Sequence, residues 1–351
     1  MKRKMNFGVI GLGRLGKIHT LNLLKIRDVR VKSVADPRME EIKRWAKGLE
    51  ITEFVCDWHR IIEDPEIDAV VIASPTVFHA EMIRAAVENG KNVFVEKPLS
   101  HNLSSAKELL NFLEDSPVKV QVAFNRRFDH NYRRVHDAIL SGKIGKPYLI
   151  RSTIRDPQLP PLEFVEKSGG IFFDFFIHEF DNIRFITSSE VEEVYAGGNA
   201  LWDERIGEAG DYDTAFAVLK MREGTLCVID SSRRAVYGYD QRMEIFGSKG
   251  RVLILNDRDT NVETRNENCV RYDNPKHDFQ HRYADSFAAE IRDFVDCLIN
   301  DKTPSVGPKD GYKAMLIAEA ATQSAKKIER SKLNIREISH PSRDERNCNK
   351  N

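Results

Sequence analysis

The sequence predicts a protein of two domains: a doubly wound parallel α/β sheet first, and then an α+β domain built on an antiparallel sheet. Three observations predict this fold class. The chain has 351 residues, which at about 150 residues per domain corresponds to roughly two domains. Residues 5–125 alternate short β-branched runs with longer amphipathic segments, the pattern of a parallel sheet with helices on its faces. After residue 126, strand-like runs follow one another with hairpin signals between them.

In the first domain, the expected strands and helices alternate along the chain. Strands are predicted over residues 7–10, 29–34, 69–73, 91–95 and 118–123. Helices, recognised by apolar residues at helical spacing, are predicted over residues 14–26, 39–47, 79–89 and 104–113. Asn89-Gly90 supplies a stop signal at the end of the third of these helices.

The second domain is expected to begin with a helix over residues 132–141 and to continue mainly as strands. The predicted strands are residues 147–154, 191–199, 213–220, 226–230, 239–246 and 251–255. Two helices, over residues 283–299 and 310–329, are expected to close it. We therefore divide the sequence into a first domain of residues 1–126, a second domain of residues 127–339 and a polar tail of residues 340–351.

The composition argues against several classes of partner. Lys+Arg and Asp+Glu are both 54, so the formal net charge is zero and no long-range field favours nucleic acid or an anionic membrane. The most apolar stretch, residues 171–177, is interrupted by Asp174 and is far shorter than the ~20 residues of a membrane span. The five cysteines form no CxxC pair and the histidines show no paired-ligand spacing. We expect a cytoplasmic protein that binds a small molecule and no metal.

A glycine-rich turn follows the first predicted strand and opens the first predicted helix. It contains Gly11, Gly13 and Gly16 in the spacing G-x-G-x-x-G. In that context the three glycines allow a tight turn, the close approach of a pyrophosphate and the packing of helix on strand. The positive end of the helix dipole and its free N–H groups would attract the pyrophosphate. The sequence therefore predicts a dinucleotide site.

The end of the second predicted strand indicates which dinucleotide is bound. Asp36 lies 20 residues after Gly16, where a carboxylate accepts hydrogen bonds from the ribose hydroxyls and repels the 2′-phosphate of NADP. NAD is therefore the expected cofactor. Arg38 could pair with a 2′-phosphate, which leaves mixed use open, or it could be a solvated residue at a helix start. A capping role for Asp36 before Pro37 is compatible with ribose binding.

Further motifs at the ends of predicted strands point to a known family. They are Ala73-Ser74-Pro75-Thr76 with His79, Glu96-Lys97-Pro98, and Gly169-Gly170 followed by Asp174 and His178. Together with the glycine-rich turn they resemble the Gfo/Idh/MocA oxidoreductases over nearly the whole chain. The resemblance implies an N-terminal Rossmann domain and a C-terminal α+β domain with a large, open, mainly antiparallel sheet. It implies the following cofactor-binding residues: Gly11, Gly13, Arg14, Leu15, Gly16, Asp36, Arg38, Ser74, Thr76, His79, Glu96 and Lys97.

Three longer stretches, residues 124–129, 155–157 and 232–242, are similar to the family members that act on inositols. This similarity implies NAD-dependent oxidation of a secondary hydroxyl of a cyclitol, myo-inositol or a close isomer, to the inosose. An NAD(P)-dependent dehydrogenase of another polyol or sugar, such as scyllo-inositol or an aldose, is the alternative. A dinucleotide-sensing regulator without catalysis is a remote third interpretation, because Lys97, Asp174 and His178 are all present.

Alcohol oxidation requires a base that takes the hydroxyl proton while hydride leaves the same carbon. His178 is the expected base, because an unperturbed imidazole has a pKa of about 6.5. Asp174 lies four residues earlier and would share one helix face with His178, where it could orient the ring. Lys97 would place an ammonium near the substrate oxygen. A core histidine, a helix N-cap and an exposed lysine are the structural alternatives. We expect a rate that rises with pH as His178 loses its proton.

A polyol also needs hydrogen-bonding partners for its other hydroxyls. Arg127 could donate several N–H groups, Asp156 could bind adjacent hydroxyls, and Tyr237 could pack its ring on the substrate. The expected substrate-binding set is Lys97, Arg127, Asp156, Asp174, His178 and Tyr237. Alternatively, Arg127 and Asp156 form a structural ion pair and Tyr237 is a strand aromatic.

An open antiparallel sheet would expose a broad apolar face on the second domain. The family commonly buries this face in dimers or tetramers, so the resemblance implies a homo-oligomer, with a homotetramer favoured.

Overall fold

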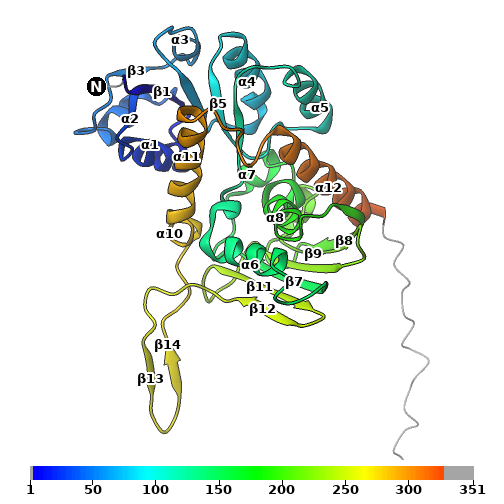
Figure 1. Ribbon diagram of the computed structural model, residues 1–351. Coiled ribbons are helices and arrows are strands. Elements are labelled where there is room, and N and C mark those ends of the chain that lie inside the picture. Colours follow the sequence, from blue (N-terminus) through cyan, green and yellow to red (C-terminus); the bar gives the residue numbers. More distant parts are fainter. Residues whose placement is uncertain (1–2, 328–351) are drawn as a thin grey trace, which may run out of the picture.

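The computed structural model describes residues 3–327 (Figure 1). Its first sheet has six strands in the order β3-β2-β1-β4-β5-β6, and every neighbouring pair is parallel. The strands are β1 (Met5–Ile10), β2 (Val29–Ala35), β3 (Glu53–Val55), β4 (Ala69–Ile72), β5 (Asn92–Glu96) and β6 (Val120–Ala123). The expected doubly wound parallel sheet is confirmed.

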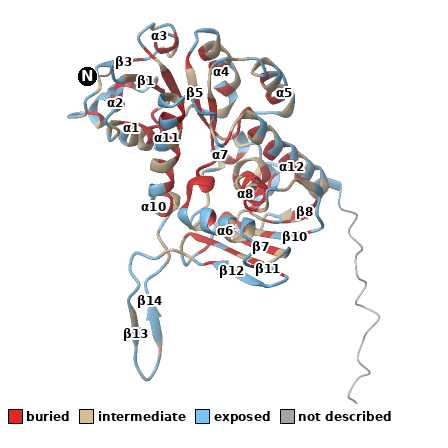
Figure 2. Ribbon diagram, viewed as in Figure 1, coloured by how far each residue is buried: buried red, intermediate tan, exposed pale blue. Residues whose placement is uncertain are grey.

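Helices cover both faces of this sheet, so its central strands are buried on both sides (Figure 2). The helices are α1 (Arg14–Leu24), α2 (Met39–Trp45), α3 (His59–Ile62), the 3₁₀ turn η1 (Thr76–Phe78), α4 (His79–Glu88) and α5 (Leu103–Phe112). Strand β3 and helix α3 were not predicted. They have three and four residues respectively, too few to show a hydrophobic period.

The second sheet also has six strands, in the order β12-β11-β7-β10-β9-β8. Only β7 and β10 pair in parallel, so the sheet is mainly antiparallel as expected. The strands are β7 (Pro147–Arg155), β8 (Val191–Asn199), β9 (Thr214–Met221), β10 (Leu226–Ser232), β11 (Asp240–Gly247) and β12 (Gly250–Ile254). Buried and exposed residues alternate along β9 and β10, so one face packs on the core and the other faces outward.

Two helices from the end of the described chain complete the core of the first domain. Helix α11 (Ala284–Ile299) lies beside α1 (Figure 1) and contributes Ile291 and Phe294 to the cluster that contains Phe7 and Val9. Helix α12 (Pro308–Lys327) contacts α5 and β6 of the first domain and α8 and β8 of the second. The two sheets thus lie on either side of the expected boundary after residue 126. Helices α11 and α12 follow that boundary in the sequence but pack against the first domain.

Several short elements surround the second sheet. Helix α6 (His130–Leu140), the π-helical turn η3 (Phe172–Phe176) and helix α8 (Ile177–Thr187) pack against it. The other elements are η2 (Asn125–Phe128), α7 (Leu162–Lys167), α9 (Glu204–Glu208), β13 (Glu263–Arg265), β14 (Val270–Tyr272) and α10 (Phe279–Arg282). The β13–β14 hairpin, which was not predicted, projects from the molecule (Figure 1). The expected polar tail, residues 340–351, lies outside the described residues. Among residues 3–327, no helix is long and apolar enough to cross a membrane.

Candidate active site

The glycine-rich turn joins β1 to α1 with little room for side chains. Gly11 has a φ of +88°, and a Cβ there would lie 2.7 Å from the Ala73 carbonyl carbon. A Cβ on Gly16 would overlap the Gly11 carbonyl oxygen. A Cβ on Gly13, by contrast, would meet nothing within 4 Å. Helix α1 begins there without a side-chain cap, so no capping side chain accepts from its first N–H groups and a phosphate could do so.

Asp36 lies beside this turn. Its carboxylate accepts hydrogen bonds from the Leu12 amide at 2.8 Å and from the Arg38 amide at 2.9 Å. The Arg38 guanidinium donates two more, both at 3.1 Å. Burial acts to raise the pKa of Asp36, but the hydrogen bonds from Arg38 and Leu12 together lower it below its ordinary value. The carboxylate is therefore ionised and anchored to the turn.

Of the residues predicted to bind the cofactor after β4, two are partly exposed and one is buried. Ser74 and Thr76 follow β4 directly beside the glycine-rich turn and are partly exposed. His79 is buried, and its two ring nitrogens each lie 2.9 Å from a backbone oxygen, of Pro98 and of Ser74. Because both nitrogens face backbone carbonyls, His79 links the ends of β4 and β5. Contact of His79 with the cofactor stays a prediction.

Arg14 and Leu15, in the same turn, face the second half of the chain. The Arg14 guanidinium lies 5.5 Å from the centre of the Phe279 ring, and Leu15 packs against the core of the second domain. Glu96, at the end of β5, is buried against His19. The turn is thus supported from both domains.

Lys97 reaches from the end of β5 to the π-helical turn of the second domain. Its Nζ donates to the Asp174 carbonyl oxygen at 2.7 Å and lies 3.5 Å from the Asp174 carboxylate. The same carboxylate accepts from Arg233 at 3.1 Å, and Arg233 also pairs with Asp211 at 3.2 Å. Asp174 therefore lies between two cations, one from each domain.

His178 lies one turn after Asp174, at the start of α8. Its Nδ1 is buried and has no hydrogen-bond partner among the described residues. Phe124 packs edge-on to its ring, with the ring centres 6.4 Å apart. Burial, and then the positive charges of Lys97 and Arg126, lower the pKa of His178 well below its ordinary value. The imidazole is therefore neutral at neutral pH.

The expected pairing of Asp174 with His178 is not formed in the described structure. Asp174 bonds to Lys97 and Arg233, whereas His178 has no bonded partner there. The prediction assumed one continuous α-helix, but Asp174 lies in a π-helical turn whose wider spacing changes the direction of its side chain. The two cations then hold the carboxylate.

Asp156 follows strand β7 and is fixed by its backbone, which donates to Ser232 and accepts from Ala235. Burial and the negative charge of Asp174 raise the pKa of its carboxyl to about 7. Arg233, Arg126 and Lys97 are near enough to oppose this rise. Asp156 therefore belongs to the same group of side chains as Lys97 and Asp174, and it titrates near neutral pH.

Arg127 lies in a different cluster from the one that the sequence interpretation assumed. It pairs with Asp181 at 2.6 Å and Asp310 at 2.9 Å, and it does not pair with Asp156. Its neighbour Arg126 pairs with Glu179 and donates to Gln241 at 2.8 Å. Adjacent side chains in the 3₁₀ turn η2 point in directions about a third of a turn apart. Arg126, rather than Arg127, consequently acts on His178 and Asp156.

Tyr237 lies at a groove on the outer face of the second sheet. Its hydroxyl donates to Asp240 at 2.7 Å and accepts from Arg155 at 2.9 Å. The groove has a volume of about 1030 Å³ and is also lined by Trp202 and Phe216. The Tyr237 hydroxyl is thus held by two strand residues, and no contact joins it to Lys97 or His178 among residues 3–327.

Comparisons with known proteins decide the family. The model of an oxidoreductase family with an NAD-binding Rossmann fold matches residues 5–124, and that of the GFO/IDH/MocA C-terminal domain matches residues 132–253. The chain belongs to the Gfo/Idh/MocA oxidoreductase family. It is an NAD-dependent dehydrogenase that acts on a CH–OH group.

Relatives of this dehydrogenase share nearly its whole length. A myo-inositol 2-dehydrogenase of Thermotoga maritima is 44% identical over 91% of this chain and 96% of its own length. An inositol 2-dehydrogenase of Rhizobium meliloti is 38% identical over 91% of this chain and 96% of its own. The crystal structure of a scyllo-inositol dehydrogenase from Lactobacillus casei with bound NAD(H) and scyllo-inositol superimposes with a TM-score of 0.86. It is 31% identical and covers 93% of this chain and 98% of its own.

The residues of the first domain fit NAD, because the space over Gly13 is open and the Asp36 carboxylate is ionised beside it. We expect Asp36→Ala to lower kcat/KM for NAD by roughly 10- to 100-fold, since hydrogen bonds to a charged group contribute about 1.5–3 kcal/mol. The same variant releases the Arg38 guanidinium, so its preference for NAD over NADP should fall. Steady-state kinetics with both cofactors measures this effect. Arg38→Ala, which leaves the carboxylate in place, is the control, and an unchanged NAD to NADP ratio in Asp36→Ala contradicts the assignment.

Two buried arginines beside the predicted site residues were outside the predicted catalytic and binding sets. Arg233 is 3% exposed and pairs with Asp174 and Asp211, and Arg126 is 3% exposed beside Glu179. Both stand in stretches that were singled out for their similarity to the family, yet a single arginine in a sequence looks like a surface residue. Only the carboxylates that surround each one, contributed by distant segments, mark it as buried.

Proposed function

We propose that the enzyme oxidises a secondary hydroxyl of a cyclitol, myo-inositol or a close isomer, to the inosose, with His178 as the base and Lys97 and Asp174 assisting. One observation carries the proposal. Lys97, at the cofactor end of the first sheet, bonds the turn that precedes His178, and its charge acts on that imidazole. The names of the relatives from Thermotoga and Rhizobium support the class of substrate.

The proposed proton transfer begins from a neutral imidazole. Because Nδ1 of His178 is buried, Nε2 is the ring nitrogen that would receive the hydroxyl proton. The Lys97 ammonium donates a hydrogen bond to the same oxygen and stabilises the negative charge that develops on it. Asp174 holds Lys97 through its backbone carbonyl. NAD, held at the Gly13 turn and by Asp36, would supply the acceptor for the hydride of the carbinol carbon. The charges of Lys97 and Arg126 then favour onward loss of the proton from His178.

The pH dependence is expected to report Asp156 rather than His178. The pKa of Asp156 is about 7, whereas that of His178 lies well below 6.5. An ionised Asp156 accepts hydroxyl hydrogen bonds, so kcat/KM for the polyol should rise with pH through about 7. In Asp156→Asn this rise should disappear. If kcat/KM still rises near pH 7 in Asp156→Asn, the assignment is contradicted and a group other than Asp156 causes the pH dependence.

The substrate class is tested by NADH formation with a panel of cyclitols and sugars. We expect myo-inositol or one of its isomers to give the highest kcat/KM, and hexoses and open-chain polyols to give values at least 10-fold lower. A higher kcat/KM for an aldose than for every inositol would establish the alternative substrate class and end the cyclitol proposal.

We also propose that the open face of the second sheet joins subunits in a homotetramer. Several large side chains on or beside this face are more than a third exposed: Tyr195, Trp202, Phe216, Val228, Val236 and Tyr237. A patch of this kind on a sheet surface is typical of an interface. Light scattering on the purified enzyme should give the mass of four 40.3 kDa chains. A stable monomer at micromolar concentration contradicts the proposal.

A further inference from the structure

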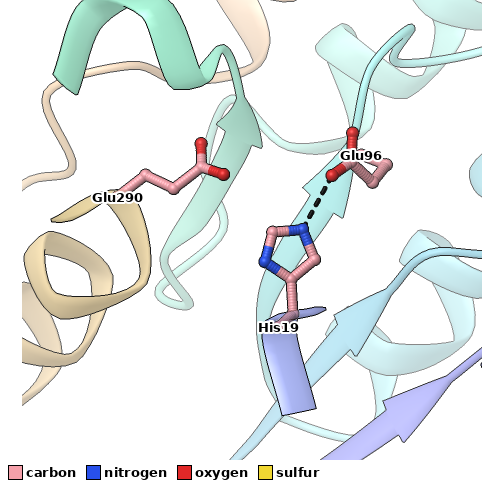
Figure 3. Close-up of side chains that lie close together, drawn as sticks. All are labelled: His19, Glu96 and Glu290. Atoms are coloured by element: carbon pink, nitrogen blue, oxygen red, sulfur yellow. Dashed lines mark hydrogen bonds and ion pairs between the residues drawn. The ribbon is translucent and has the colours of Figure 1, made fainter. Parts of the chain in front are cut away.

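A buried group of three ionisable side chains lies behind Lys97, outside the proposed proton path. His19 belongs to α1, Glu96 is the last residue of β5, and Glu290 lies in the middle of α11 (Figure 3). His19 and Glu290 are 0% exposed and Glu96 is 6% exposed. One nitrogen or oxygen of each lies within 4.8 Å of those of the other two. Three segments that are distant in the sequence thus meet at the residue that precedes Lys97.

Three buried polar atoms of this group have no hydrogen-bond partner among the described residues. His19 Nε2 lies 2.7 Å from a carboxylate oxygen of Glu96, so this pair is satisfied. Both carboxyl oxygens of Glu290 and Nδ1 of His19 are buried without a partner among the described residues. A buried ionised carboxylate without a donor is strongly disfavoured. The unpaired atoms are all acceptors unless one of them carries a proton.

The charges that surround Glu290 do not favour its ionised form. The ionisable groups that face it are His19 from α1 and Glu96 from β5, and His19 is already bonded to Glu96. The neighbouring strand β6 presents an uncharged residue, Gln121, whose amide donates to the Glu290 backbone oxygen. Burial, and then the charge of Glu96, raise the pKa of Glu290 well above its ordinary value.

We propose that Glu290 is a neutral carboxylic acid and that, with His19, it is a positioning residue that holds Glu96 and thereby Lys97 in place for the reaction. A proton on Glu290 provides the donor that the group otherwise lacks. Because Glu96 is bonded on one side and Lys97 follows it directly, a displacement of Glu96 moves the Lys97 ammonium from the Asp174 carbonyl. The role of Lys97 in this inference rests on the proposed function; the protonation of Glu290 does not.

The first test compares thermal unfolding of the full-length enzyme and Glu290→Gln from pH 5 to pH 9. Glutamine keeps the shape and a donor but cannot ionise. The folded-state pKa of Glu290 is raised, so the folded protein binds more protons than the unfolded chain, and stability is lost as pH rises from about 4.5 towards the folded-state pKa. We expect the melting temperature of Glu290→Gln to increase relative to that of the wild type as pH rises. Asp285→Asn, which removes an exposed carboxylate from the same helix, should show no such trend.

The second test separates positioning from mere stability. With the best cyclitol, Glu290→Gln should keep kcat within about two-fold of the wild type. Glu290→Leu, which has no donor, should lose about 10-fold in kcat while KM for NAD changes less than two-fold. If Glu290 had a purely structural role, kcat would not depend on whether the replacement side chain is a hydrogen-bond donor, as in glutamine, or not, as in leucine.

The outcomes are distinct. A melting-temperature difference that is constant with pH, or an equal loss of kcat in the glutamine and leucine variants, overturns the inference. One equivalent of metal bound to the purified enzyme also overturns it, because a cation would then neutralise the carboxylates. If the wild type oxidised no cyclitol but the melting temperatures diverged with pH as stated, the proposed function would fail and the neutral Glu290 would stand.

Discussion

Replacement of His178 by alanine is expected to lower kcat for cyclitol oxidation by about 10²- to 10⁴-fold, the range over which a positioned general base contributes. The imidazole is neutral at neutral pH because burial and the charges of Lys97 and Arg126 lower its pKa. The wild type therefore holds the base in its active form without prior deprotonation. KM for NAD should change little, since His178 belongs to α8 of the second domain.

Steady-state kinetics and NADH binding measured by fluorescence check this result. His130→Ala, which removes an exposed histidine from the second domain, is the matched control and should retain kcat within about two-fold. A His178→Ala enzyme that turned over within about three-fold of the wild type would exclude this histidine as the base.

Lys97→Met should lower kcat by about 10²-fold or more, because it removes both the donor to the substrate oxygen and the bond to the Asp174 turn. The variant has a second consequence with a definite sign. The Lys97 charge lowers the pKa of Asp156 as well as that of His178, so without it both pKa values rise. As pH is lowered, the residual activity of Lys97→Met should therefore begin to fall at a higher pH than the activity of the wild type does.

A pH profile of kcat for Lys97→Met, with Lys107→Met as an exposed-lysine control, measures both effects. A fall in activity that moved to lower pH would contradict the electrostatic effect of Lys97 on Asp156 and His178. Full activity in Lys97→Met would contradict the assignment of Lys97 itself.

The sequence alone predicted the order of the main elements correctly. The five long strands of the parallel sheet are β-branched runs between amphipathic helices, and the glycine-rich turn lies between β1 and α1 as expected. These features are local, because hydrophobic period and glycine spacing are set by neighbouring residues. The resemblance to the family likewise rested on contiguous motifs, and the comparisons confirm it.

The partners of the charged side chains could not be predicted in the same way. Asp174 pairs with Lys97, which lies 77 positions earlier in the chain, and with Arg233, which lies 59 positions later. The choice between Arg126 and Arg127 depends on the direction of each side chain in a 3₁₀ turn. The pKa of Asp156 depends on burial and on a carboxylate from another element.

The sequence by itself determined the fold class, the dinucleotide turn and the family, since each is encoded in runs of adjacent residues. Only the tertiary structure decided that Asp174 bonds Lys97 instead of His178, that Asp156 titrates near neutral pH, and that Glu290 on α11 lies beside Glu96. The physical reason is that ionisation and hydrogen bonding depend on burial and on charges brought together from distant segments. Chain folding creates those environments.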